Sequence, residues 1–540
     1  MELDPDACYS ALLTRDRRFD GWFFVGVAST GVYCRPVCAV RTPLKRNCSF
    51  YLSAAAAEQA GFRPCLRCRP ELAPGHGVLD LSGQLARAAA ALIDQGLSDR
   101  DGLGVVAGRV GVTPRHLRRI FETEFGVSPV AYAQTQRLLL AKRLLTDTAL
   151  PMAEVAGAAG FGSVRRFNHL FRSRYGLTPL RLRKAGSAST GDDLLTLSLA
   201  YRPPYAWAPL IDFLARRAVD GVEHITADRY CRAVAFAGAP GAKPVTGWIT
   251  VSCERPQGRL ADPLPEGNKA RGSKLPCGSL DGAESERLAS REVDKELGAA
   301  RRFLEPERHS LRLTLPPRLS PHIGRILAGV RRLFDLGARP DLIDTHLPEF
   351  AAEVPGLRVP GALNGFEIAL RAVVGQQIGL PQARAILARL AQQHGTPVPD
   401  APHGLCRTLP DAPTLAACTP EALQACGLTR ARAHSLHALA LAVTSGRVTL
   451  QPLAPVEPTL AALRALPGIG DWTAQMIALR GLGWPNAFPA ADLVLRKQLG
   501  LSRPDDVLAH AARWAPWRGY AAMHLWRRAA QGEPECIRTM

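Results

Sequence analysis

The 540-residue sequence contains no run of eighteen apolar residues, so no segment of it predicts a membrane-spanning helix. The first six residues include acidic side chains and lack the apolar core of a secretory signal peptide, so we expect no such signal. The 13 cysteines are odd in number and scattered, which argues against a disulfide framework. These absences predict a cytoplasmic protein without a membrane partner, whose cysteines serve as thiols or metal ligands.

Acidic residues are also in short supply. The chain has 48 Asp and Glu against 67 Lys and Arg, which gives a formal net charge of +19 at pH 7. A surplus of this sign favours a polyanion such as nucleic acid as the partner, although a solvated basic surface would give the same count. A chain of this length exceeds a single hydrophobic core, so we expect three to five domains.

Two close-spaced cysteine pairs, Cys34-Arg-Pro-Val-Cys38 and Cys65-Leu-Arg-Cys68, are present near the N-terminus. Four thiolates at this spacing can converge tetrahedrally on one zinc ion. The alternative is two unrelated pairs of buried thiols. That alternative is weaker, because the second pair lies among arginines, which are poor core residues.

Two similar helical units follow, at residues 105–121 and 152–171. In each, a short apolar-patterned helix meets a glycine turn, and then Thr113 or Ser163 can cap a basic second helix. This is the helix-turn-helix arrangement, in which the second helix enters the major groove of DNA. A pair of plain helical hairpins is the alternative. The basic residues predicted to contact DNA are Arg115, Arg118, Arg119, Arg165 and Arg166.

The segment Leu466-Pro-Gly-Ile-Gly-Asp-Trp-Thr-Ala474 predicts a turn between two short helices. Gly468 and Gly470 leave backbone N–H groups free at a helix N-terminus, where they can bind a DNA phosphate. Asp492 follows at a fixed distance, after a loop rich in Gly and Pro. The alternative is an ordinary helical corner in which Asp492 only caps a helix.

The cysteine pairs lie among further motifs, including Asp20-Gly-Trp-Phe-Phe-Val-Gly-Val and Asn47-Cys-Ser-Phe-Tyr. Together with the pairs, these motifs resemble the N-terminal domain of the Ada adaptive-response family. The resemblance implies that Cys34 is both a zinc ligand and the acceptor of a methyl group from a DNA methylphosphotriester. One zinc ion would be structural and would also hold the sulfur as a nucleophilic thiolate.

The two helical units close with Gly126-Val-Ser-Pro129 and Gly176-Leu-Thr-Pro179, and so resemble AraC-type DNA-binding domains. The chain beyond these units contains Arg202-Pro-Pro-Tyr-Ala-Trp and Phe213-Leu-Ala-Arg-Arg-Ala-Val. With the glycine hairpin and Asp492, these segments resemble 3-methyladenine DNA glycosylase II of the AlkA type, a helix-hairpin-helix glycosylase.

The second resemblance implies a catalytic role for Asp492, either in stabilising positive charge on the sugar or in activating water. Gln377 matches the position of the residue that wedges into the DNA stack. Relatives that also cut the strand carry a lysine at the position of Trp472, so we expect no lyase activity. We expect no cofactor for this half. The implied base pocket, which would bind cationic purines by stacking, consists of Trp472, Trp526, Phe213 and Met476.

The predicted fold is multidomain: a small α/β zinc domain, an all-α double helix-turn-helix, an α+β glycosylase N-domain and an all-α helix-hairpin-helix domain. The predicted boundaries are residues 1–78, 82–185, 192–318 and 319–540. Residues 255–309 are polar and rich in Pro, Gly, Glu and Lys, and we interpret them as an insertion in the third domain.

The chain is therefore expected to be an alkylation-response protein: a DNA glycosylase fused to a methylphosphotriester acceptor and transcription regulator. Its expected partners are alkylated and promoter DNA, with RNA polymerase as a further partner, and the expected state is a monomer. One alternative is a transcription regulator whose glycosylase half is inactive and only holds DNA. Another is a repair enzyme whose front half merely targets DNA.

Overall fold

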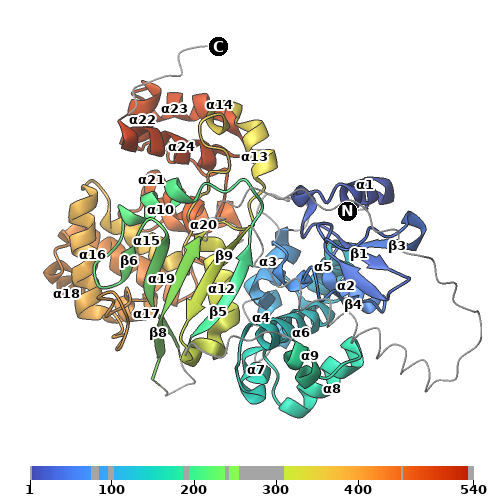
Figure 1. Ribbon diagram of the computed structural model, residues 1–540. Coiled ribbons are helices and arrows are strands. Elements are labelled where there is room, and N and C mark those ends of the chain that lie inside the picture. Colours follow the sequence, from blue (N-terminus) through green and yellow to red (C-terminus); the bar gives the residue numbers. More distant parts are fainter. Residues whose placement is uncertain are drawn as a thin grey trace, which may run out of the picture.

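The computed structural model describes residues 3–74, 84–94, 102–185, 194–237, 243–253, 309–451 and 454–532. The N-terminal elements, in blue and teal, lie on one side of the molecule, and the orange and red helices lie on the other (Figure 1). Apart from His309, the expected insertion at 255–309 lies outside the described residues. None of the helices in these ranges is long and apolar enough to cross a membrane.

The N-terminal domain is a small sheet covered by short helices, with strand order β3-β1-β2-β4. Strand β2 pairs with β4 in parallel, and β1 pairs with β2 and β3 in antiparallel fashion. Gly26 in β1 has no room for a side chain, since a Cβ there would lie 2.8 Å from the rings of Phe62 and Tyr51. The elements are α1 (Pro5–Leu13), η1 (Arg17–Phe19), β1 (Phe24–Val27), β2 (Val32–Cys34), η2 (Lys45–Asn47), β3 (Cys48–Tyr51), α2 (Ala54–Gln59), β4 (Arg63–Pro64) and η3 (Pro70–Leu72).

The next region is helical and contains both expected helix-turn-helix units. The side chains of Thr113 and Ser163 cap the second helix of each unit by accepting from His116 N–H and Arg166 N–H. Each of these helices ends at a glycine with positive φ, Gly126 or Gly176, which only a residue without a Cβ adopts freely. The helices are α3 (Gln84–Asp94), α4 (Gly102–Arg109), α5 (Pro114–Phe125), α6 (Pro129–Asp147), α7 (Met152–Ala158), α8 (Val164–Tyr175) and α9 (Pro179–Ala185).

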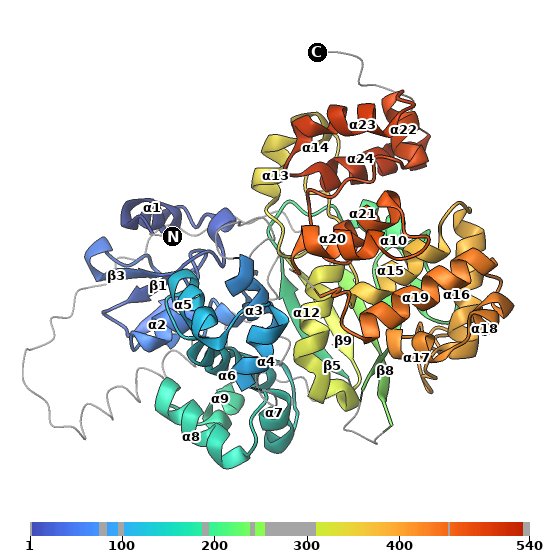
Figure 2. The same cartoon turned by 180° about the vertical axis from the view of Figure 1, so that it is seen from behind.

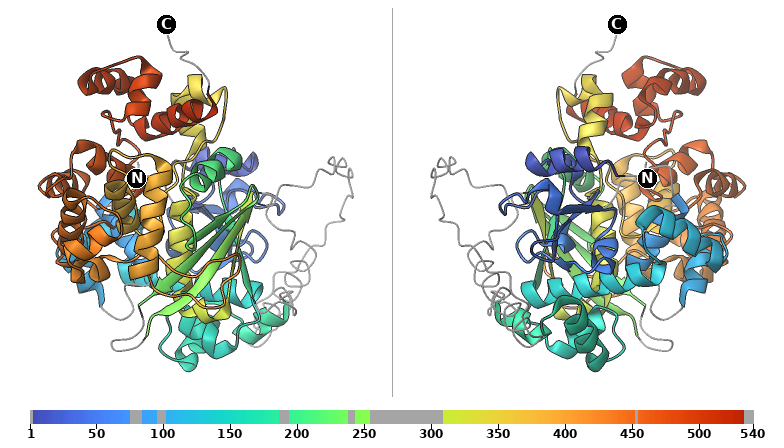
Figure 3. Two further views of the ribbon diagram at one scale, coloured as in Figure 1. Left: turned by 90° about the vertical axis from the view of Figure 1, so that its left-hand side faces the viewer. Right: turned by 90° about the vertical axis from the view of Figure 1, so that its right-hand side faces the viewer.

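The third region is an antiparallel sheet with strand order β5-β9-β8-β7-β6. Side chains of β5 alternate between buried and half-buried, as expected for a strand with one face on a core. Figure 3 shows the sheet nearly edge-on, beside the yellow helix α12. The elements are β5 (Leu195–Ala200), α10 (Trp207–Ala215), β6 (Glu223–Ile225), β7 (Arg229–Phe236), β8 (Val245–Cys253), β9 (Ser310–Leu315), η4 (Pro317–His322) and α12 (Ile323–Leu333).

The last region is all-helical, and one apolar core joins most of its helices. Helices α22 to α24 gather with α13 and α14 at one end of the molecule (Figure 1). These observations confirm the expected fold class. The elements are α13 (Pro340–His346), α14 (Pro348–Ala351), α15 (Gly365–Val374), α16 (Leu380–His394), α17 (Ala412–Ala417), α18 (Pro420–Ala425), α19 (Arg430–Thr444), α20 (Val456–Arg464), α21 (Asp471–Arg480), α22 (Leu493–Leu499), α23 (Pro504–Ala511), η5 (Ala512–Trp514) and α24 (Arg518–Gln531).

The helix-turn-helix region and the sheet share one apolar core rather than meeting as separate bodies. Helix α7 packs on η4, and α6 packs beside β5. The buried guanidinium of Arg143 in α6 donates to the backbone oxygen of Ser198 in β5. Helix α3 packs against α12, where a Cβ at Gly324 would lie 3.4 Å from the backbone oxygen of Asp94. Figure 2 shows α3 and α4 beside α12 from behind.

Candidate functional site

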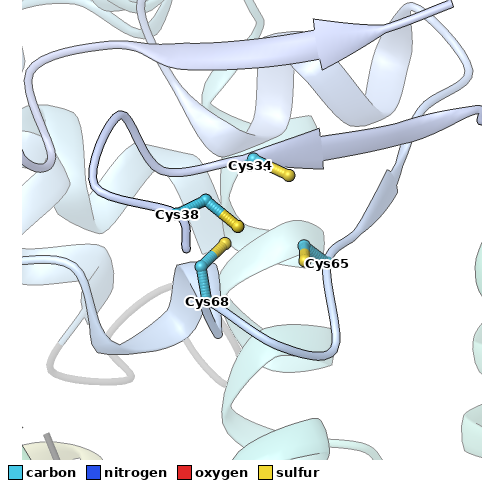
Figure 4. A group of neighbouring side chains, drawn as sticks. All are labelled: Cys34, Cys38, Cys65 and Cys68. Atoms are coloured by element: carbon cyan, nitrogen blue, oxygen red, sulfur yellow. The ribbon is translucent and has the colours of Figure 1, made fainter. Parts of the chain in front are cut away.

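The four cysteines predicted to bind zinc converge in the N-terminal domain. Their sulfur atoms all lie within 4.8 Å of one another, and the side chains point toward a common centre (Figure 4). The sheet explains the convergence, because the parallel pairing of Tyr33 with Pro64 sets Cys34 beside Cys65. A tight turn that follows Cys34 then carries Cys38 back toward the other sulfurs, through a hydrogen bond from Cys38 N–H to the backbone oxygen of Arg35.

The chemistry of the four thiols fits a divalent cation. Hydrogen bonding to Cys38 and Cys65 raises the pKa of the Cys34 thiol well above its usual range. Burial raises the pKa of Cys68 in the same way, whereas hydrogen bonds from the other three thiols lower the pKa of Cys65. Thiolates packed this closely repel one another, so the cluster needs a positive charge at its centre. A zinc ion supplies the positive charge that keeps all four sulfurs deprotonated.

Arg35 is a residue of this site that the sequence did not single out. Its side chain is 3% exposed, and it forms a two-point ion pair with the carboxylate of Asp20. Its backbone N–H donates to Sγ of Cys68 at 3.3 Å, and its guanidinium donates to the backbone oxygen of Cys68 at 3.0 Å. Arg35 therefore joins the metal cluster to the rest of the domain.

The five arginines predicted to contact DNA all lie on the solvent side of the second helix of a helix-turn-helix unit. Their side chains are exposed, while the apolar residues of the same helices, such as Leu117 and Phe167, are fully buried. The two helices are α5 and α8, which carry Arg115, Arg118, Arg119, Arg165 and Arg166. This arrangement leaves both basic faces open to a nucleic acid.

The predicted phosphate-binding hairpin is formed by α20, a glycine turn and α21. Gly468 has φ of +72°, and a Cβ there would lie 2.1 Å from Oγ of Ser435, so no other residue fits without rearrangement. Gly470 precedes α21, whose N-terminus has no side-chain cap. A Cβ at Gly470 would meet no atom within 4 Å. The first N–H groups of α21 are thus available to an anion.

Asp492 is half-buried at the start of α22, where its carboxylate accepts four hydrogen bonds. Oδ1 accepts from the backbone N–H groups of Val494 at 3.0 Å and Leu495 at 3.1 Å, which makes Asp492 the N-cap. The indole Nε1–H of Trp526 also donates to Oδ1 at 3.2 Å, and that of Trp472 donates to Oδ2 at 3.0 Å. The capping role considered as an alternative is therefore real, and it coexists with two contacts that a cap does not need.

Of the four residues predicted to line the base pocket, Trp472 and Trp526 contact this carboxylate, but not all four are open. Phe213 is 8% exposed, and its ring centroid lies 6.3 Å from that of Trp526. The guanidinium of Arg217 lies 3.7 Å from the Phe213 ring centroid, so this cation already covers one face of the ring. Met476 is half-buried on α21, the helix that carries Trp472. The stacking role of Phe213 remains a prediction.

Arg217 was not identified from the sequence, where it is the second arginine of Phe213-Leu-Ala-Arg-Arg. Burial and, to a smaller extent, the neighbouring Arg216 lower its pKa to about 10, although the negative charge of Asp492 opposes the shift. Arg217 is thus a cation within electrostatic reach of the carboxylate.

Gln377, the predicted wedge, is exposed and has φ of +53°, an uncommon conformation outside glycine. The preceding residue, Gln376, was missed. Its amide nitrogen donates to the backbone oxygen of Gly468 and to Oγ1 of Thr473, both at 2.9 Å. The loop that presents Gln377 is therefore tied directly to the hairpin.

A four-cysteine zinc domain, two helix-turn-helix units, and a hairpin with a nearby carboxylate together define a modular DNA-binding protein of the glycosylase fold. Family models agree with this class. Residues 7–71 match the metal-binding domain of Ada, residues 106–185 a helix-turn-helix domain, and residues 196–264 and 283–364 the AlkA N-terminal domain. The chain belongs to the family of bifunctional transcriptional activator/DNA repair proteins of the AlkA type.

Three relatives match the whole chain or one of its two parts. A probable bifunctional transcriptional activator/DNA repair enzyme AlkA of Mycobacterium tuberculosis is 35% identical over 541 residues and is aligned over 97% of each chain. DNA-3-methyladenine glycosylase 2 of Escherichia coli is 30% identical and covers 61% of this chain and 96% of its own. The bifunctional transcriptional activator/DNA repair enzyme AdaA of Bacillus subtilis is 31% identical and covers 34% of this chain and 84% of its own.

Proposed function

We propose that the protein is a monofunctional DNA glycosylase that excises alkylated bases such as 3-methyladenine, fused to a methylphosphotriester acceptor that regulates transcription. The observation that carries the enzymatic part is the carboxylate of Asp492. It is held by two indole N–H groups and lies in the same helical region as a hairpin with free backbone N–H groups.

The proposed reaction begins when the hairpin binds a phosphate and Gln377 fills the space left by a base that has rotated out of the stack. The bond between C1′ of the sugar and the base nitrogen breaks, and its electron pair leaves with the base. Water then adds to C1′ and loses a proton to solvent. The carboxylate of Asp492 already accepts four hydrogen bonds, about as many as its two oxygens can accept, so it has little capacity left to take a proton from water. This supports stabilisation of the positively charged sugar over activation of water.

In the second proposed reaction the sulfur of Cys34 attacks the methyl carbon of a methylphosphotriester. The bond from that carbon to the phosphate oxygen breaks, the oxygen keeps the electron pair as a phosphodiester, and the sulfur becomes a thioether. Zinc supplies the thiolate form of the sulfur. Four thiolates with one zinc carry a formal charge of −2, which methylation reduces to about −1, so repulsion of DNA falls and the affinity for DNA should rise.

The exposed arginines of α5 and α8 support promoter DNA as the partner of the regulatory half. RNA polymerase as a further partner, a monomeric state and a cytoplasmic location are parts of the same proposal.

One experiment tests both reactions. Purified protein is incubated with a methylated duplex, and free bases and the mass of the Cys34 peptide are measured. Asp492→Asn should lower release of 3-methyladenine by about 100-fold or more while leaving Cys34 methylation intact, because asparagine still caps α22 but carries no charge. Cys34→Ala should show the reverse pattern. Asp505→Asn, at a side chain 87% exposed, is the matched control.

The outcome also separates the alternatives. If the wild-type protein releases no base, the second half is an inactive DNA-holding module. If transcription after alkylating stress is the same in wild type and Cys34→Ala, the first half only targets DNA.

A further inference from the structure

The zinc domain is fastened to the glycosylase half by a buried arginine. Nη2 of Arg202 donates to the backbone oxygen of Asp20 at 2.6 Å, and Nη1 donates to the backbone oxygen of Gly337 at 3.0 Å. Arg202 is 1% exposed and Asp20 is 5% exposed. Arg339 adds a second contact, with its guanidinium 4.8 Å from the ring of Trp22. Contacts this deeply buried cannot be exchanged for contacts with water, so the two parts must move together.

On the zinc side, one residue, Arg35, connects Asp20 to the predicted metal ligands. Asp20 forms the buried ion pair with Arg35, the residue that follows Cys34. Arg35 in turn donates to the backbone oxygen and to Sγ of Cys68. Any displacement of the backbone at Cys34 or Cys68 is therefore passed to Asp20.

On the other side, the contact continues to the carboxylate of the glycosylase. The backbone oxygen of Arg202 accepts from the fully buried Arg358 at 2.6 Å, and Arg358 donates to the backbone oxygen of Asp335 at 3.1 Å. The carboxylate of Asp335 accepts from the hydroxyl of Tyr520 at 2.7 Å. Tyr520 lies on α24, the helix that carries Trp526. Trp526 donates to Oδ1 of Asp492.

Methylation of Cys34 would change both the packing around its sulfur and the charge of the cysteine cluster. The cavity beside Cys34 and Cys38 measures about 10 Å³ and is lined by Leu12, Val25 and Val27. A cavity of roughly this size barely holds one water-sized group. A methyl group on the sulfur that enters this cavity would fill it and contact its lining, while the loss of negative charge weakens the pull on Arg35.

We propose that Arg202 is a positioning residue that couples the methylation state of Cys34 to the carboxylate of Asp492, so that the glycosylase responds to the sensor. The proposal rests on the function proposed above for Cys34 and Asp492. Coupling of this kind is reciprocal. If methylation of Cys34 alters the binding of a ligand at Asp492, then a ligand bound at Asp492 must alter the sensor by the same free energy. The test therefore measures coupling directly, at the two ends of this chain of contacts.

The test follows the indole N–H of Trp526 by nuclear magnetic resonance in the full-length zinc-bound protein, with the resonance assigned through Trp526→Phe. Cys34 is methylated with methylphosphotriester DNA, the DNA is removed, and spectra before and after are compared. We expect the Trp526 resonance to shift and the single-turnover rate of base release to change at least threefold. Arg202→Met keeps the length and packing of the side chain but has no hydrogen-bond donor. In this variant methylation should leave the Trp526 resonance unshifted and change the rate of base release by less than 1.5-fold.

Arg202→Lys keeps a charge and one donor and should restore part of the response, which guards against a Met variant that fails to fold. Arg318→Met is the matched control, because Arg318 is exposed and also bonds a backbone oxygen of the sheet domain. The coupling is overturned if a methyl group is confirmed on Cys34 but neither the Trp526 resonance nor the rate of base release changes. It is also overturned if the response persists in Arg202→Met.

The mass of the Cys34 peptide separates the two proposals. If no methyl group is found there, the proposed acceptor function fails. Cys34→Ser then replaces methylation as the change at the sensor. A Trp526 shift in this variant that disappears when Arg202→Met is added supports the coupling, and its absence overturns it.

Discussion

Trp472 donates its indole N–H to Oδ2 of Asp492 at 3.0 Å, and this contact fixes the ring edge-on to the carboxylate. The sequence suggested Trp472 only as a stacking wall for a flipped base. A ring bonded through its nitrogen edge can still offer a face to a base, but it also orients the carboxylate. Trp526 does the same for Oδ1 from α24. The two tryptophans therefore have a polar role as well as an aromatic one.

Replacing either tryptophan by phenylalanine separates these roles. Phenylalanine keeps an aromatic face but has no N–H, so one hydrogen bond to a charged group is lost, worth roughly 1.5–3 kcal/mol. We expect Trp472→Phe and Trp526→Phe each to lower the single-turnover rate of 3-methyladenine release by about 10- to 100-fold. Affinity for an undamaged duplex should be unchanged. Trp484→Phe, half-buried on the same apolar core, is the control, and a loss of equal size there would mean a general packing defect.

The sequence predicted the functional groups wherever they lie in one short segment. The zinc site could be predicted because each cysteine pair is a local motif, and short strands bring the two pairs together. The glycine hairpin and the two capped basic helices were predicted for the same reason, since caps and turns depend on neighbouring residues. The contact from Trp526 to Asp492 spans 34 residues, and that from Arg202 to Asp20 spans 182. No periodicity or spacing encodes such pairs, because they depend on how separate helices and domains pack.

The contacts of Gln376 also join residues far apart in the sequence, and they give a second prediction. It bonds the hairpin at two points, and each neutral bond is worth roughly 1 kcal/mol. Gln376→Ala should free the loop that presents Gln377 and lower kcat/KM for base release by about 10-fold, with Cys34 methylation unaffected. Gln392→Ala, at an exposed glutamine of α16, should leave kcat/KM unchanged. Equal values for wild type and Gln376→Ala would show that the loop is held by other contacts.

The exposed arginines of α8 give a third prediction, about affinity rather than catalysis. A side chain that neutralises one phosphate contributes close to one unit to the slope of log affinity against log salt. Arg165→Ala and Arg166→Ala should each weaken duplex binding and lower this slope by about one if the residue contacts phosphate. An unchanged slope with altered sequence preference would instead assign the residue to a base edge. Fluorescence anisotropy at several salt concentrations measures both, and Arg503→Ala, 73% exposed and far along the chain, is the control.

Glu58 gives the last prediction, because it joins the zinc domain to helices α6 and α8. Its Oε1 accepts from the hydroxyls of Tyr33 at 3.0 Å and Tyr175 at 3.2 Å, and its Oε2 accepts from Thr135 at 3.0 Å. Burial raises the pKa of this carboxyl to about 7, although the three hydroxyls and the charge of Arg174 oppose the shift. The folded protein thus binds a proton at Glu58 more tightly than the unfolded chain does.

The sign of the pH effect follows from that difference. Below the usual pKa of 4.5 both states hold the proton, and the contribution of Glu58 to stability is fully present. As the pH rises from 4.5 to about 7, the unfolded chain releases this proton, whereas the folded state must either keep it or bury a charge, and up to about 3 kcal/mol is lost. Glu58→Gln keeps the shape and an acceptor but cannot titrate. We expect the unfolding temperature measured by calorimetry to fall between pH 4.5 and about 7 in wild type and to stay nearly flat in Glu58→Gln, so parallel curves would contradict the assignment.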